Sequence, residues 1–77
     1  MQTNIVKVNG ILWSGTADSV TAPGSQGELT VLPHHIPLVT TLRAGRLVVK
    51  KGGAEVFTQD IEGGMLEVTG ESVMVLL

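Results

Sequence analysis

Short stretches that mix apolar and polar residues, separated by Gly or Pro, make up the whole chain. The longest stretches without either residue are residues 1–9 and 54–62, because ten Gly and three Pro punctuate the 77 residues. A helix shorter than about 12 residues is marginal without packing support, and Gly costs about 1 kcal/mol inside one. Many stretches instead alternate between apolar and polar positions or are rich in β-branched residues, which is typical of strands. The pattern therefore predicts an all-β fold.

The first turn is predicted at Asn9 and Gly10, directly after the β-rich run at residues 4–8. This pair is a strong signal of a two-residue hairpin, because both central residues of a type I′ turn need positive φ. The return strand is expected to continue through residues 11–22, with a bulge at residues 14–15. Its core candidates are Ala17, Val20 and Ala22.

In the middle of the chain, residues 23–27 are predicted to form a loop, because Pro and Gly dominate the segment. Residues 28–32 follow as a strand with Leu29 and Val31 on one face. The next proline ends this strand before an irregular corner at residues 34–37.

The second half of the chain reads as further short strands separated by glycines. Strands are expected at residues 38–42, 46–51, 56–61, 65–68 and 72–77, with breaks or turns at 43–45, 52–53, 63–64 and 69–71. Leu47 and Val49 share a face of their strand. The total is about eight to ten short strands, at the spacing of a β-sandwich or β-barrel.

The last predicted strand is apolar on both faces. Val73, Val75 and Leu77 fall on one face, and Met74 and Leu76 on the other. Such a strand is either central and covered on both sides, or it presents one face to a partner. The sequence leaves both possibilities open.

Charge and composition exclude several classes of function. The formal net charge of −2, from five basic and seven acidic residues, argues against nucleic-acid binding, and one Trp with one Phe provides no platform for stacking bases. The chain has no cysteine and therefore no disulfide framework. It also lacks an 18-residue apolar stretch and the basic start and apolar run of a signal peptide.

No pattern of catalytic, cofactor-binding or metal-ligating residues emerges. His34 and His35 are adjacent, so in an extended chain their side chains point in opposite directions and can hardly chelate one ion. No serine lies in a nucleophile-elbow pattern, and the glycine pairs lack the spacing of a phosphate loop. We therefore expect no catalytic, cofactor or metal site, and a domain that works by binding through its surface.

The segment 24–38 carries a specific resemblance. It reads GSQGELTVLPHHIPL, which is similar to the central signature G-x-x-G-E-[FL]-x-[VI]-[LY]-P-G-H-x-P-L of the epsilon subunit of F-type ATP synthases. The order and spacing of further motifs agree over nearly the whole chain. These motifs are residues 13–15, 42–45 and 63–68.

The resemblance implies a flattened β-sandwich, the N-terminal domain of epsilon, spanning residues 1–77 as a single domain. It implies a non-catalytic place at the foot of the rotating central stalk, where the domain joins the gamma subunit to the membrane-embedded ion-driven ring during proton-driven ATP synthesis. The domain is then peripheral, on the cytoplasmic or organelle-equivalent face of an energy-coupling membrane, with membrane contact only through the complex.

The resemblance also assigns two groups of interface residues. The ring-facing group is the polar loop Ser25, Gln26, Gly27 and Glu28, with Glu28 as the first choice for an ionic contact. The gamma-facing group, at the corner, is His35, Ile36, Pro37 and Leu38. An ordinary turn acid at Glu28 and a purely structural corner histidine at His35 remain the alternatives.

Two departures from the family pattern stand out. His34 replaces the usual Gly of the corner, so a residue with a Cβ must carry any positive φ there. The family also continues after the sandwich with two helices that regulate ATP hydrolysis and in some members bind ATP, whereas this sequence stops at Leu77, so that helical hairpin is expected to be absent.

Two other classes of function remain as alternatives. A stand-alone small-molecule or carbohydrate-binding sandwich predicts a concave ligand pocket and a stable monomer. A histidine-based metallohydrolase predicts bound zinc.

Overall fold

The computed structural model describes all 77 residues, and it contains only strands, turns and loops. Seven strands form one sheet in the order β2-β1-β7-β6-β5-β3-β4. Their bounds are β1 Gln2–Lys7, β2 Gly10–Thr16, β3 Ser19–Gly24, β4 Gly27–Val31, β5 Leu38–Lys51, β6 Ala54–Thr69 and β7 Ser72–Leu76.

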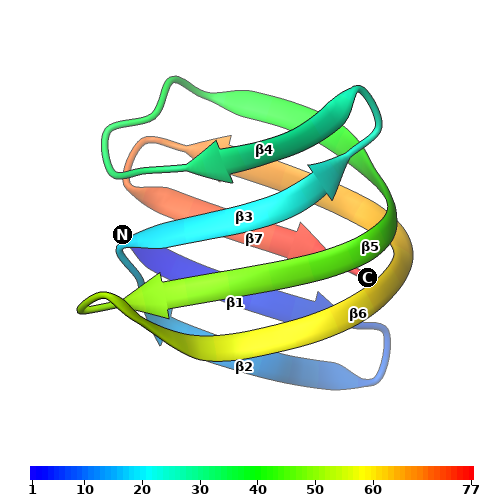
Figure 1. The fold of residues 1–77 in the computed structure, drawn as a ribbon, viewed down its shortest axis with the longest axis horizontal. Helices are drawn as coiled ribbons and strands as arrows, with labels where there is room; N and C mark the ends of the chain where they lie inside the picture. Colours follow the sequence, from blue (N-terminus) through cyan, green and yellow to red (C-terminus); the bar gives the residue numbers. More distant parts are fainter.

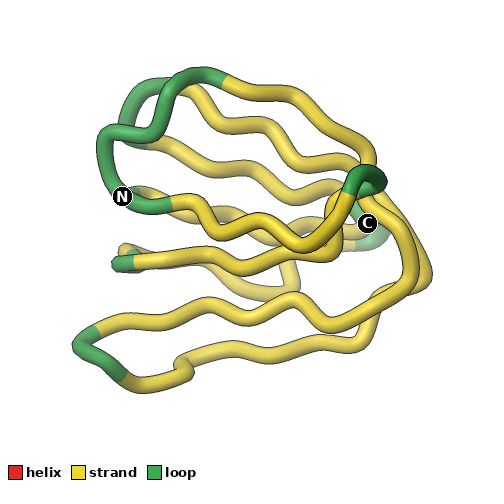
Figure 2. Tube along the Cα trace, turned by 45° about the horizontal axis from the view of Figure 1, so that its top comes forward, coloured by secondary structure: helices red, strands yellow, loops and turns green.

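The sheet folds over on itself because its two longest strands bend. β5 and β6 pair along almost their whole length, and both curve sharply at one end of the molecule (Figure 1). The back layer contains β2, β1, β7, residues 65–69 of β6 and residues 38–42 of β5, and the front layer contains the remaining parts of β6 and β5 with β3 and β4. Figure 2 shows the two layers facing each other, which confirms the predicted small β-sandwich.

The core fills the space between the two layers with alternate residues of each strand. Strand periodicity of two puts every second side chain inside, as in β7, where Val73 and Val75 are fully buried, and in β3, where Val20 and Ala22 are. The core candidate Ala17 is buried too, and so are Leu47 and Val49, which were expected to share a face. No buried side-chain nitrogen or oxygen lacks a hydrogen-bond partner, so the core contains no polar defect.

The expected breaks at residues 43–45 and 63–64 are wrong, since β5 and β6 run through both. These segments lie opposite each other in the ladder, with Arg43 beside Gly63 and Leu42 beside Gly64. Gly63 and Gly64 in β6, and Gly45 in β5 two residues beyond Arg43, let both strands bend in the same region without breaking the pairing. Two bent strands therefore replace four short ones, and the division of residues 11–22 into β2 and β3 brings the total to seven.

Three local predictions also need correction. The first hairpin turns at Val8 and Asn9, because Gly10 opens β2 with a φ of +150° and pairs with Lys7. The bulge in β2 lies at Leu12 and not at residues 14–15, because Ile5 pairs with Trp13 and Val6 pairs with Ile11.

The third correction concerns segments 11–22 and 23–27. The chain leaves the β2 strand after Thr16 and starts β3 at Ser19, so residues 11–22 form two strands. Pro23, Gly24 and Gly27 belong to strands and only residues 25–26 form the turn. A bulge between Thr21 and Gly24 in the pairing with β5 accommodates a proline that has no N–H to donate.

Candidate interaction surfaces

The polar loop proposed from the sequence is a tight turn between β3 and β4. Ser25 and Gln26 are exposed, and they are flanked by the paired residues Gly24 and Gly27. The Ser25 N–H donates a hydrogen bond to the Thr41 carbonyl oxygen at 3.0 Å, which ties the turn to β5. Of the proposed ring-facing group, Ser25 and Gln26 lie in this surface turn, whereas Gly27 and Glu28 lie in β4.

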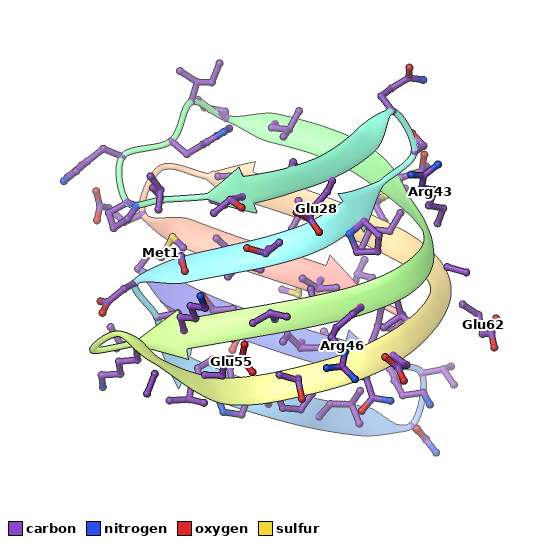
Figure 3. The ribbon with its side chains drawn as sticks, viewed as in Figure 1. Met1, Glu28, Arg43, Arg46, Glu55 and Glu62 are labelled. Carbon is purple, nitrogen blue, oxygen red and sulfur yellow. The ribbon has the colours of Figure 1, made fainter.

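Glu28 lies just inside β4, on the outer surface of the front layer (Figure 3). Its neighbours alternate with it in burial, because Leu29 turns toward the core and Thr30 is exposed. The chain contains one Arg–Asp ion pair, Arg46 with Asp60, and one His–Glu contact, His34 with Glu71, so the Glu28 carboxylate has no basic partner within the chain. It is therefore free for a contact with another molecule.

The corner between β4 and β5 begins with a hydrogen-bonded turn. The His35 N–H donates to the Leu32 carbonyl oxygen at 3.2 Å, with Pro33 and His34 in the two central positions. His34 has a φ of +67°, the only positive φ of a residue other than glycine. Proline followed by a residue of positive φ is the requirement of a type II turn, which normally uses Gly there. The positive φ considered from the sequence is thus present and is carried by a histidine.

The four residues of the gamma-facing group have different settings. His35 is half-buried, and its Nδ1 lies 2.7 Å from the Ile36 carbonyl oxygen. Ile36 is 76% exposed and Pro37 is exposed, while Leu38 packs against the core cluster. Ile36 and Pro37 are thus open to a partner, whereas His35 and Leu38 also stabilise the corner.

The two groups of residues lie at opposite ends of β4. The strand starts at the β3–β4 turn and runs across the molecule to the β4–β5 corner (Figure 1). Five residues at about 3.4 Å each put roughly 15 Å between the two segments. One side of the sandwich thus offers a polar turn, and the other an exposed apolar corner.

A third surface is the outer face of the back layer, where apolar side chains form a row across four strands. In the ladder Ile11 pairs with Val6, Val6 with Leu76, and Leu76 with Met65, so all four share one face. Ile11 is 67% exposed, Leu76 48% and Met65 41%. We call these four residues the apolar row.

Next to the apolar row, three further residues are paired across β7, β6 and β5 on the same face. Met74 pairs with Glu67, and Glu67 pairs with Val39, which is 61% exposed. The sequence identified Met74 and Leu76 as candidates for a partner-facing side. Ile11, Met65 and Val39 were not identified, because their proximity depends on cross-strand register, which the local pattern does not contain.

The surface has one small hollow, of about 230 Å³, between the β1–β2 hairpin and the bend of β6. Leu12, Ile61 and Leu77 form its apolar walls, and Lys7 and Glu62 are among the charged residues beside it. Pockets for small molecules are typically about 300–1,000 Å³. The hollow is thus smaller than a typical ligand site.

No three His, Asp or Glu side chains gather closely enough to hold a metal ion. The two adjacent histidines engage different partners, His34 the Glu71 carboxylate and His35 a carbonyl oxygen of its own loop. The fold also has no helix of the length and apolar character that a membrane crossing requires.

These features define the class: a small bent-sheet β-sandwich domain with apolar side chains exposed along one face and at one corner. The family model described as "ATP synthase, Delta/Epsilon chain, beta-sandwich domain" matches residues 1–77. The chain belongs to this family, as the resemblance at residues 24–38 had indicated.

Similar proteins include the ATP synthase epsilon chain of Dehalococcoides mccartyi, with 42% identity over 76 residues, covering 99% of this chain and 54% of the relative. The ATP synthase epsilon chain of Brevibacillus brevis is 36% identical over 76 residues, covering 99% of this chain and 58% of the relative. The chain thus spans a little more than half the length of these relatives.

Two solved structures share the fold. A chain in the Euglena gracilis mitochondrial ATP synthase structure of OSCP, F1 and c-ring matches with a TM-score of 0.87 and 23% identity, over 96% of this chain and 48% of that one. A chain in the central stalk and c-ring structure of the Tetrahymena thermophila mitochondrial ATP synthase matches with a TM-score of 0.83 and 14% identity, over 99% of this chain and 61% of that one.

Proposed function

We propose that residues 1–77 act as a single, non-catalytic domain of the central stalk of an F-type ATP synthase, which couples the gamma subunit to the membrane-embedded ion-driven ring during proton-driven ATP synthesis. Family membership supports the ATP synthase assignment. The two solved structures with the same fold are of a central stalk with its ring and of F1 with its ring, which supports a place in the rotor. The domain is then peripheral, at the cytoplasmic or organelle-equivalent face of the membrane.

The exposed apolar face of the back layer is the single observation that carries this proposal. A contiguous apolar surface on a small domain marks a site of protein contact, because water around it is released when a partner covers it. The apolar row and Val39 lie on this face, and Ile36 adds an exposed apolar side chain at the β4–β5 corner. We assign the face and corner to the gamma subunit.

The polar segment Ser25–Glu28, made of the β3–β4 turn and the first two residues of β4, suits a contact of a different kind. Its exposed side chains can form hydrogen bonds, and the unpaired Glu28 carboxylate can form an ion pair with a cation of the ring loops. We therefore assign this segment to the ring. A contact at each end of β4 allows the domain to hold two partners at once.

The fold suits a part that transmits torque. Of its 48 backbone hydrogen bonds, 42 lie within the strand ladders, so the whole chain is cross-linked into one sheet. Force applied at one end of β4 passes through the paired strands to the other end. On this proposal ion flow turns the ring, the domain turns with it, and gamma carries the rotation to the catalytic head.

A reconstitution with purified partners tests the proposal. The chain is mixed with gamma alone and with the isolated ring, and binding is measured for the unchanged chain and for Glu28→Ala, Ile36→Asp and a control, Glu55→Ala, which alters another exposed carboxylate. We expect Glu28→Ala to weaken binding to the ring only, Ile36→Asp to weaken binding to gamma only, and Glu55→Ala to change neither. Failure of the unchanged chain to bind either partner would contradict the proposal.

A further inference from the structure

The side chain of His34 links two loops that are distant in sequence. His34 Nδ1 lies 2.7 Å from Glu71 Oε1, so the β4–β5 corner is joined to the turn between β6 and β7. Both side chains are largely exposed, at 83% and 63%. The contact is absent from the expectations drawn from sequence, because nothing in the local pattern brings residues 34 and 71 together.

The backbone of His34 gives this contact its significance. A φ of +67° is one that glycine adopts freely and that a residue with a Cβ adopts at a cost. The type II turn of Leu32 to His35 requires such a φ at this position. A histidine here therefore costs free energy relative to glycine. An interaction of its side chain that glycine cannot make would offset this cost.

Glu71 offers a firm attachment for such an interaction. Its own carbonyl oxygen accepts a hydrogen bond from the Gln2 N–H at 3.0 Å, which fixes the β6–β7 turn to β1. Thr69 and Ser72 are paired on either side of this two-residue turn, and Gly70 supplies the positive φ of +55° that the turn needs. Glu71 is thus held by three strands, while the corner carrying His34 spans six residues without a strand partner.

We propose that His34 and Glu71 form a clamp that holds the β4–β5 corner in one conformation and so presents Ile36 ready for docking. The clamp offsets the strain of a non-glycine residue in the turn by a hydrogen bond between the His34 imidazole and the Glu71 carboxylate. Its effect on partner binding rests on the proposed function, whereas its effect on the corner is a property of the chain itself. His35, the other titratable residue of the corner, bonds to the Ile36 carbonyl oxygen and is not part of the clamp.

A double-mutant cycle on the 77-residue chain tests the clamp. Thermal unfolding is followed for the unchanged chain, Glu71→Ala, His34→Gly and the double variant, at low salt. We expect Glu71→Ala to lower the midpoint by about 2 to 5 °C when His34 is present, and by less than about 1 °C in the His34→Gly background. Glu62→Ala, a matched change at another exposed carboxylate, should have the same small effect in both backgrounds.

Amide hydrogen exchange at His35 reports on the corner directly, because its N–H closes the turn. We expect exchange to become about two- to fivefold faster in Glu71→Ala than in the unchanged chain. The clamp would be overturned if Glu71→Ala lowered the unfolding midpoint equally with His34 and with His34→Gly. It would also be overturned if Glu71→Ala left exchange at the His35 N–H unchanged.

Binding to purified gamma separates the clamp from the proposed function. We expect Glu71→Ala to weaken gamma binding by about two- to fivefold, in line with the exchange result, and to have no effect in the His34→Gly background. Equal affinity of all four chains would overturn the role of the clamp in docking. If the effect of Glu71→Ala on the unfolding midpoint and on His35 exchange depends on His34, but no chain binds gamma, the clamp is supported and the proposed function is refuted.

Discussion

Pro23 lies directly against the backbone of Gly45, so closely that a Cβ atom at position 45 would come within 2.8 Å of the Pro23 Cβ. The two residues belong to β3 and β5, at the point where β5 bends. The glycine is therefore required for close approach of two strands, and its φ is not positive.

This contact predicts that Gly45→Ala destabilises the fold by about 1 to 3 kcal/mol, because the rigid proline ring cannot move aside. Chemical denaturation measures the free energy of unfolding. In the Pro23→Gly background, where the clashing atoms are gone, the same change should cost clearly less. An equal loss in both backgrounds would show that the contact is not the cause.

Gly63 and Gly64 should respond differently to alanine although both sit in β6 with a φ near +155°. Both variants place a Cβ in a backbone conformation that costs about 1 to 3 kcal/mol. A Cβ on Gly64 would also collide with the Leu76 carbonyl oxygen, whereas one on Gly63 would lie 3.4 Å from the Leu42 carbonyl oxygen. Gly64→Ala is therefore expected to lose more stability than Gly63→Ala in thermal unfolding, and the reverse order would contradict this.

Asp18 stabilises the turn between β5 and β6 from outside the hairpin. Its Oδ2 accepts a hydrogen bond from the Gly52 N–H at 2.6 Å. We expect Asp18→Asn to reduce the free energy of unfolding by less than Asp18→Ala, which should cost about 1 kcal/mol. The exposed carboxylate of Asp60, which pairs with Arg46, serves as the control, because Asp60→Ala should have little effect on stability.

Substitutions on the two opposite faces of β7 distinguish an effect on folding from an effect on binding. Val73 is fully buried and Leu76 is 48% exposed in the apolar row. Val73→Asp should abolish the cooperative unfolding transition, because it buries an unpaired charge. Leu76→Asp should leave the circular dichroism spectrum and the transition close to those of the unchanged chain, yet weaken gamma binding at least tenfold. Undiminished binding by Leu76→Asp would show that gamma does not cover this face.

Much of the fold follows from local pattern, because burial at alternate positions is a local property. The buried Val20 and Ala22 follow from it, and so do the division of β7 into two faces and the tight turn at residues 52–53, where both glycines have positive φ. The same reasoning fails at residues 63–64, where glycines mark a bend rather than an end. The difference depends on the residues paired with them, Arg43 and Leu42, which lie 20 and 22 residues away in the sequence.

The candidate surfaces divide in the same way. The turn at residues 25–26 and the exposed corner at Ile36 are local features and were found from sequence motifs. The apolar row depends on the register of four strands, and the contact between His34 and Glu71 joins two separate loops. Neither can be predicted from a short stretch of sequence. A shift of register by one residue would separate the side chains of the apolar row, although the sequence of each strand would be unchanged.

The position of β1 between β2 and β7 has a consequence for synthesis in the cell. β1 pairs in parallel with β7, from Gln2 beside Ser72 to Val6 beside Leu76, so its neighbour is the last of the seven strands of this domain to be synthesised. Until then the first hairpin has no third strand to cover it, and isolated two-stranded hairpins are only marginally stable in water. Pairing across 70 residues is also a contact of very high sequence separation, which slows folding. The domain is therefore expected to fold only after β7 has been synthesised, in a late step that joins its first strand to its seventh.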